Sequence, residues 1–260
     1  MTRTRSARFT AAAVALCLAA LPLACGDSSS GGLFDTSCSD IGKKPADLSS
    51  SVKATPLIIL IDVNSNTAAM AKRISDDVAG VIGDVTDTAP DLIITGYASG
   101  GVGTSLKKID CMDSNEYVFV GGNERRQDAD RTELKKQLAA AIEKTVRATK
   151  VAATGDSRVL LRQVPTIVKP TEASKVILWS TFLAQGSDCL AFDPGESPSD
   201  ALATQVADRC AQGNLLPTLT GSSLTVVGAG FSDDRPELTP FGKSLALQLC
   251  RRMTPECDVR

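Results

Sequence analysis

The run Leu57-Ile58-Ile59-Leu60-Ile61 decides how this chain folds. Five successive aliphatic residues make both faces of a strand apolar, which is typical of parallel sheets covered by helices. The run ends at Asp62, and residues Thr67–Ile82 follow with apolar side chains at four-residue spacing. That spacing predicts an amphipathic helix. The folded part of the chain is therefore expected to begin with a buried strand and the helix that covers it.

The same alternation continues along the chain. Further strands are predicted at Asp91–Ala98, Glu116–Val120, Lys175–Thr181 and Leu224–Gly228. Helices are predicted after a capping box at Asp130-x-x-Glu133, over 159–164 before Pro165, at Ala201–Cys210 and from Thr239-Pro240 onward. The link between the second and third strands lacks helical periodicity, which predicts a hairpin. We therefore expect an α/β fold: a mostly parallel open sheet with helices on both faces and one antiparallel edge strand.

The first 25 residues have the pattern of an export signal. Three arginines precede an almost uninterrupted apolar run over Phe9–Leu23, which is too short and wrongly flanked for a membrane span. Ala24, a small residue, then stands before Cys25. The pattern resembles a bacterial lipoprotein signal, although Pro22 occupies the position where leucine is favoured. The resemblance implies that Cys25 becomes the lipid-carrying N-terminus after cleavage.

A change of composition after Cys25 supports this interpretation. The stretch Gly26–Gly32 is rich in glycine and serine, as a polar tether is. We expect residues 1–24 to be a signal peptide, 25–54 to be the lipidated cysteine and tether, and 55–260 to be the folded domain. Two or more acyl chains on one cysteine would anchor the protein stably to the extracytoplasmic face of the cell membrane. The alternative is an ordinary secreted protein in which Cys25 is left to pair.

The cysteines agree with export. The chain has 8 cysteines, of which Cys17 leaves with the signal and Cys25 takes the lipid. An even number of cysteines in an exported domain predicts three disulfides. The six candidates are Cys38, Cys111, Cys189, Cys210, Cys250 and Cys257. A local Cys189–Cys210 bridge is one expectation, and a clamp from Cys38 to Cys250 or Cys257 is the other, since chain ends often lie close together.

Composition excludes several classes of function. The net charge is −2, no basic block occurs, and aromatic residues make up 4% of the chain, so a nucleic-acid partner is not expected. The chain contains no histidine, which excludes Ser-His and Cys-His nucleophiles. Ser-x-x-Lys occurs at Ser50–Lys53 and Ser105–Lys108, but neither lies in a periodic helical stretch. We interpret both as solvated loop residues and expect no enzyme.

The order of the predicted elements resembles the von Willebrand factor A domain, over about Thr55 to Met253. In that family, Asp-x-Ser-x-Ser follows the first strand, and a threonine and an aspartate from later loops complete a site for Mg²⁺ or a similar ion. The ion then accepts a carboxylate from a partner protein. The resemblance therefore implies a protein-binding module whose site lies at the carboxyl ends of the strands.

The metal motif of that family is only partly present. Asp62, Asn64 and Asn66 stand at the Asp-x-Ser-x-Ser positions, and Thr154 is placed to supply the threonine. The fourth strand ends in Trp179-Ser180-Thr181-Phe182, so the aspartate is missing. A single carboxylate balances the charge of a divalent ion poorly.

Two hypotheses remain for these residues. One is a weak Mg²⁺ or Ca²⁺ site, with Asp156 as an additional ligand. The other is that Asp62 ends the strand while Asn64 and Asn66 serve as turn or N-cap residues. The pattern favours the second, a degenerate site without a cofactor.

The favoured function is a membrane-anchored, non-enzymatic protein-binding or scaffold module, acting through Asp62–Asn66 and Ser180–Phe182 on an unidentified protein partner. A solute-binding lipoprotein is one alternative, which would need a cleft between two lobes. A cell-wall-binding lipoprotein is another, because Val226–Asp233 followed by a helix resembles the peptidoglycan-binding OmpA-like pattern, with its basic helix residue at Lys243 or Arg251. Two interpretations are open for the adjacent Asp233 and Asp234: they line the carboxyl-end face where ligands bind in such sheets, or they are solvated loop residues, which is favoured.

Overall fold

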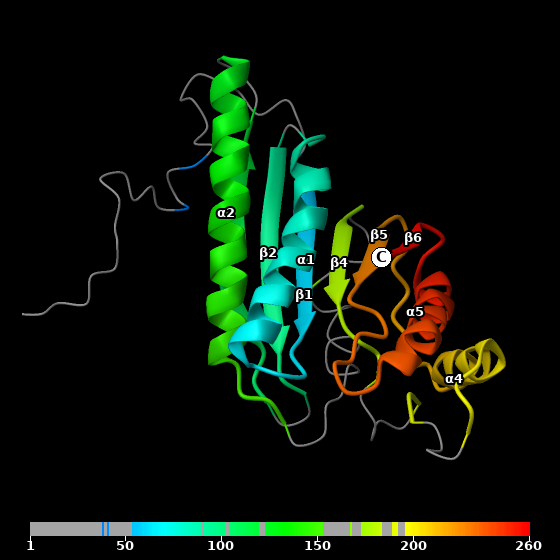
Figure 1. The fold of residues 1–260 in the computed structure, drawn as a ribbon. Coiled ribbons are helices and arrows are strands. Elements are labelled where there is room, and N and C mark those ends of the chain that lie inside the picture. The colour runs from blue at the N-terminus through cyan, green and yellow to red at the C-terminus, as the bar shows by residue number, and fades with distance from the viewer. Residues whose placement is uncertain are drawn as a thin grey trace, which may run out of the picture. The chain divides into compact units, whose positions relative to one another are not determined.

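Strand β1 (Thr55–Asp62) runs through the middle of a six-stranded sheet in the computed structural model (Figure 1). The other strands are β2 (Asp91–Ser99), β3 (Lys107–Val118), β4 (Lys175–Trp179), β5 (Ser223–Val227) and β6 (Cys257–Val259). Their order in the sheet is β3-β2-β1-β4-β5-β6. Only the β2–β3 pair is antiparallel among the pairs of this sheet. The mostly parallel α/β sheet with one antiparallel edge strand is therefore confirmed.

The structure describes residues 38, 41, 54–89, 91–101, 104–119, 123–152, 167, 173–183, 189–191 and 196–260. All of them belong to one compact unit, Thr36–Arg260. The short helix predicted over 159–164 lies outside the described residues, as does the signal and tether region up to residue 37. Within the described part, no helix is both long enough and apolar enough to cross a membrane.

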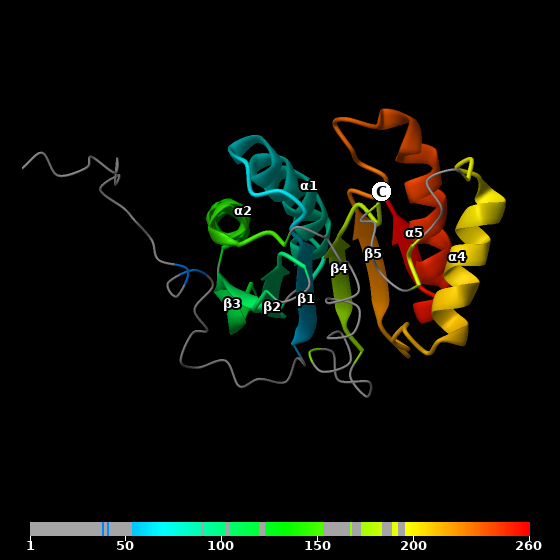
Figure 2. The same cartoon turned by 90° about the horizontal axis from the view of Figure 1, so that it is seen from below.

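Helices cover both faces of the sheet. They are α1 (Ala68–Thr86), α2 (Glu124–Ala148), α4 (Asp200–Gln212) and α5 (Thr239–Met253), with a 3₁₀ turn, η2 (Pro236–Leu238), before α5. Figure 2 shows α1 and α2 on one side of the row of strands and α4 and α5 on the other. The fully aliphatic run of β1 explains this arrangement, because successive side chains of a strand point to opposite faces. Ile59 packs in the core under α1 and α2, whereas Leu60 packs in the core under α4 and α5.

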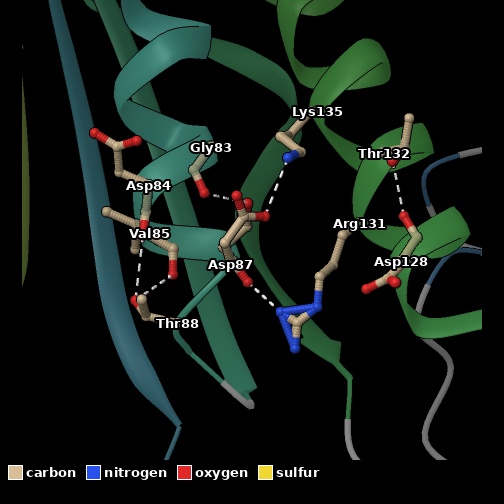
Figure 3. Close-up of polar contacts among 10 residues, drawn as sticks. Gly83, Asp84, Val85, Asp87, Thr88, Asp128, Arg131, Thr132 and Lys135 are labelled. Carbon is tan, nitrogen blue, oxygen red and sulfur yellow. Dashed lines mark hydrogen bonds and ion pairs between the residues drawn. The ribbon is translucent and has the colours of Figure 1, made fainter. Parts of the chain in front are cut away.

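Polar contacts fasten the end of α1 to α2 (Figure 3). Arg131 of α2 donates to the carbonyl oxygen of Thr86, and the Lys135 ammonium lies 3.1 Å from the Asp87 carboxylate. Ser75, in the middle of α1, donates to the carbonyl oxygen of Ala139 at 2.8 Å. These contacts accompany an apolar seam between the two helices and hold α1 in a fixed position over β1.

Two boundaries differ from the sequence prediction, and both differences involve polar residues. Helix α2 begins at Glu124, because the Asn123 side chain accepts a hydrogen bond from the Arg125 amide at 2.9 Å and caps the helix there. The predicted capping box at Asp130 is therefore wrong. The first turns of α2 are solvated and carry no apolar periodicity, so the pattern gave no signal for them. Strand β3 begins at Lys107 rather than Glu116, since it is an edge strand whose alternation is broken where Cys111 adopts φ 67°.

The structure pairs all six expected cysteines. The predicted Cys189–Cys210 bridge is confirmed, and the other two bridges are Cys38–Cys111 and Cys250–Cys257. The predicted clamp between Cys38 and the C-terminal cysteines is wrong. Cys111 lies in β3 and Cys257 in β6, and these strands form opposite edges of the sheet. Three disulfides are typical of proteins that fold in an oxidising compartment.

Candidate functional site

The carboxyl ends of β1, β4 and β5 meet at one edge of the sheet, toward which the arrowheads of β1 and β4 point in Figure 1. The register pairs Ile61 with Trp179 and Trp179 with Val227. The residues that follow these three positions, Asp62, Ser180 and Gly228, therefore leave the sheet side by side. Such an edge is where ligands bind in open α/β sheets.

Asp62 is a buried carboxylate that joins two of these strand ends. It is 3% exposed, and its Oδ2 accepts a hydrogen bond from the Ser180 hydroxyl at 2.9 Å. The Ser180 oxygen in turn accepts from the backbone amide of Phe182 at 3.2 Å. Asp62 thus fixes the turn after β4, and its carboxylate is engaged by the protein itself.

The two asparagines use their amide groups to bridge loops. The Asn64 Nδ2 donates to the Thr181 hydroxyl oxygen at 3.5 Å, and the Asn66 Nδ2 donates to the Thr149 carbonyl oxygen at 3.1 Å. Neither asparagine caps the following helix, because the Thr67 side chain accepts from the Met70 amide at 3.3 Å. The N-cap role expected for these asparagines is therefore wrong.

The described residues that the sequence named for this site offer a divalent cation few oxygen ligands. Asp62 is the one carboxylate among them, and the Nδ2 groups of both asparagines donate to protein acceptors. Among the described residues no group of three or more acidic, cysteine or histidine side chains is placed to hold a metal. One oxygen, the buried Oδ1 of Asn64, has no hydrogen-bond partner there. Thr154 and Asp156 lie outside the described residues, so their part in such a site stays a prediction.

These loops surround a cleft of ≈ 380 Å³. Its lining includes Asn64, Met70, Thr181, Leu183, Asp233 and Asp234. Asp233 and Asp234 were expected to be solvated loop residues. Both are exposed, and they also form one wall of this cleft. We call it the carboxyl-edge cleft.

A fold of the β5–α5 loop brings the aspartates there. The Gly230 amide donates to the Thr181 carbonyl oxygen at 2.9 Å, which ties this loop to the turn after β4. Gly230 has φ +75°, and a Cβ at this position would lie 2.4 Å from the Thr239 carbonyl oxygen. Only glycine fits such a position. The Gly-Ala-Gly sequence after β5 was the one signal that the loop turns back.

The lysine of the Ser-x-x-Lys spacing at Ser105 is engaged elsewhere. Lys108 lies 2.5 Å from the Asp113 carboxylate, and the preceding Lys107 donates to the Ala148 carbonyl oxygen. Ser105 itself is exposed. Lys108 thus has a carboxylate as its partner, and Ser50–Lys53 lies outside the described residues.

No family model and no curated protein matches the sequence. Solved structures similar in fold include proximal thread matrix protein 1 from the mussel byssus, with 11% identity and a TM-score of 0.37 over 80% of this chain and 44% of that one. Manganese-loaded Plasmodium vivax TRAP protein is similar at 15% identity and a TM-score of 0.33, over 80% of this chain and 68% of that one. Human COPII-coat protein Sec24c is similar at 14% identity and a TM-score of 0.34, over 73% of this chain and 28% of that one. This chain thus spans less than half of the mussel protein.

The sheet has the mostly parallel arrangement with one antiparallel edge strand that the order of elements in the sequence implies. The antiparallel β3 lies at one edge, and helices follow β1, β3 and β4 in the expected alternation. Strand β6 was not predicted. It has three residues and extends the sheet beyond β5.

Proposed function

We propose that this chain is a lipid-anchored, non-enzymatic protein-binding module on the extracytoplasmic face of a cell membrane. The observation that carries the binding part is the carboxyl-edge cleft. Loops after β1, β4 and β5 close around it, and two of its acidic side chains are exposed to solvent. The partner is a protein that contacts these loops directly, without a resident metal.

The lipid anchor rests on the sequence around Cys25. Residues 1–24 act as the signal, residues 25–54 carry the lipid and the tether, and residues 55–260 form the binding domain. The three disulfides use every cysteine downstream of Cys25. Cys25 is then the cysteine left for acylation in the mature protein, and two or more acyl chains would hold it in the membrane.

The binding surface is preorganised by the contacts that fix its loops. The buried Asp62–Ser180 bond holds the turn after β4, and the Gly230–Thr181 bond holds the loop after β5. A surface that is already ordered loses little conformational entropy when a partner binds. This rigidity supports recognition of a protein by loops on a scaffold.

The anchor is tested with two cysteine variants of the full chain, Cys25→Ala and the matched control Cys17→Ala. We expect the wild type and Cys17→Ala to remain with the membrane fraction and to show an acylated N-terminal peptide by mass spectrometry. Cys25→Ala should lose both. Membrane retention of Cys25→Ala, or an unmodified Cys25 in the wild-type peptide, would contradict lipidation.

The binding surface is tested with a photo-crosslinking amino acid introduced into the cell-envelope form of the chain. Ser65 and Asp233 line the cleft from two different loops, whereas exposed Arg251 on α5 is the control position. We expect one and the same protein adduct from both cleft positions and none from Arg251. Failure to obtain a shared adduct, or an equal yield from Arg251, would contradict the proposal.

A further inference from the structure

A second cleft, of ≈ 490 Å³, lies between α1 and the segment that runs from β5 into α5. It is distinct from the carboxyl-edge cleft, although Phe231 lines both. Its lining includes Asp76, Asp77, Val81, Phe231, Lys243 and Arg260. The volume lies within the range of about 300–1,000 Å³ that is usual for small-molecule sites. We call it the lateral cleft.

The lateral cleft is lined by acidic side chains of α1 and by basic side chains of three segments, and the basic residue of α1, Arg73, is already paired with Asp77. Asp76 and Asp77 come from α1, Lys243 comes from α5, and Arg260 follows β6. Arg260 is already paired with Asp84 and Asp258. Lys243 is exposed and has no ion pair with a described residue. The cleft therefore offers one uncommitted cation together with carboxylates on α1.

The carboxylates differ in how firmly they are held. Asp77 accepts a hydrogen bond from the indole N–H of the fully buried Trp179 at 3.2 Å, and the Arg73 guanidinium lies 3.4 Å away. Among the described residues Asp76 pairs only with Lys72, and both of these side chains are more than half exposed. Such exposed pairs contribute little and exchange readily. Asp76 is thus free to take another cation, while Asp77 stays in place beside it.

Apolar groups complete the lining. Val81 and Val227 are buried, and the Phe231 ring is covered by the Arg73 guanidinium at 4.0 Å. Gly228 has φ +77°, and a Cβ there would lie 2.6 Å from the Trp179 ring. The glycine therefore lets the buried indole approach the backbone that lines the cleft and keeps Trp179 within reach of Asp77.

We propose that the lateral cleft binds a zwitterionic amino-acid ligand, either a free amino acid or a short peptide. Asp76, beside Asp77, accepts hydrogen bonds from the ligand's ammonium group. Lys243 donates to its carboxylate, and its apolar side chain packs against Val81 and Phe231. Opposite charges on two elements select a ligand that carries both charges, because a ligand with one charge leaves the other group of the cleft without a new partner. This inference stands apart from the proposed protein-binding function.

Calorimetric titration of the disulfide-bonded chain tests the charges of the ligand first. The probes are L-leucine, the dipeptide Leu-Leu, N-acetyl-L-leucine and L-leucinamide. We expect leucine or the dipeptide to bind, and whichever binds more tightly identifies the source of the zwitterion. Removing one charge should weaken binding about tenfold or more, since charge-assisted hydrogen bonds are the stronger kind. Equal affinity for the blocked compounds, or no binding of either zwitterion at millimolar concentration, would overturn the proposal.

Three variants then assign the charges to residues. Lys243→Gln should weaken leucine binding about tenfold while leaving leucinamide unaffected, and Asp76→Asn should weaken leucine binding while leaving N-acetyl-leucine unaffected. Arg251→Gln, on the same helix as Lys243 but outside the lining, should bind like the wild type. Loss of affinity in Arg251→Gln equal to that in Lys243→Gln would show a general charge effect and refute the site.

Discussion

The two faces of the sheet are covered in different ways. The first face carries α1 and α2, which are 19 and 25 residues long, and the second carries α4 and α5, which are 13 and 15 residues long. Each of the two short helices contains one cysteine of a disulfide, Cys210 in α4 and Cys250 in α5. Neither of the long helices contains a cysteine.

The difference teaches how each layer is stabilised. Long helices bury a long apolar stripe against the strands and against each other, so burial holds the first layer. The two helices of the second layer together bury slightly fewer residues, and cross-links that restrict the unfolded chain supplement them. The helices of the first layer therefore depend on burial alone, whereas those of the second depend on burial and on their disulfides. The Cys38–Cys111 bridge lies on the first side, but it joins β3 and carries no helix of that layer.

Adjacent residues of β1 test the two cores separately. Ile59 and Leu60 are both 0% exposed and lie in different cores. Ile59→Ala and Leu60→Ala should each lower the free energy of unfolding by about 2–5 kcal/mol, because each leaves a cavity. Chemical denaturation of the single and double variants measures both effects. The two losses should add within about 0.5 kcal/mol if the sheet separates the cores. A coupling clearly above that value would show one continuous core and break the comparison.

Removing the disulfides one at a time should affect stability in the order of their loop lengths. The sequence separations are 73 for Cys38–Cys111, 21 for Cys189–Cys210 and 7 for Cys250–Cys257. Loop-closure entropy predicts losses of about 4, about 3 and about 2.5 kcal/mol. Paired Cys→Ala variants avoid burying a serine hydroxyl, and urea unfolding gives the three values.

The same variants sharpen the comparison of the two faces. Loss of either bridge on the second face should make Leu60→Ala more damaging than Ile59→Ala. Equal sensitivity of the two core variants in the bridge-deleted background would show that the cross-links do not act on the second layer in particular.

Apolar patterns were sufficient to predict most of the fold. The aliphatic run of β1 and the four-residue spacing after it predicted a buried strand and its helix, and both are present. Errors arose where polar residues carry the structure. The first turns of α2 are solvated, and β3 is a bulged edge strand. A residue pattern cannot fix such boundaries, because its signal comes from burial.

The candidate site was predictable in the loops after β1 and β4 only. Asp62 and Thr181 were named from the sequence, and the structure places both at the edge of the sheet where β1 and β4 end. Asp233 and Asp234 were interpreted as solvated, and both are exposed. Their place in the cleft wall depends on the Gly230–Thr181 hydrogen bond, which joins two loops that are distant in the sequence. The lateral cleft was not foreseen for the same reason. Its walls come from elements far apart in the sequence.

Neighbouring aspartates of α1 give the next largest effect. Asp77→Ala leaves the buried indole N–H of Trp179 without its acceptor, which should cost about 1–3 kcal/mol of unfolding free energy. Asp76→Ala removes an exposed pair with Lys72 and should leave stability unchanged within error. Denaturant unfolding of the two variants measures the contrast. An equal loss of unfolding free energy in the two variants would mean that the hydrogen bond from Trp179 to Asp77 stabilises the protein no more than the exposed Lys72–Asp76 pair does.

The smallest expected effect concerns Tyr117, a buried phenol in the first-face core. Tyr117 is 1% exposed, and its hydroxyl donates to the Cys111 carbonyl oxygen at 2.7 Å. Burial raises the pKa of Tyr117 above its ordinary value of 10.0, against a weaker opposing effect of the Asn115 amide. In the unfolded chain the phenol therefore loses its proton at a lower pH than in the folded chain.

The sign of the pH dependence follows from this order. Above about pH 10 the unfolded state binds fewer protons than the folded state, so the stability contributed by Tyr117 falls as pH rises. Tyr117→Phe lacks the titration and keeps the ring. Urea unfolding at about pH 9 and about pH 11 should show the wild type losing more stability than Tyr117→Phe. A parallel loss in the two proteins would mean that the phenol ionises equally well in the folded state, and that the edge of the first layer opens to water where β3 bulges.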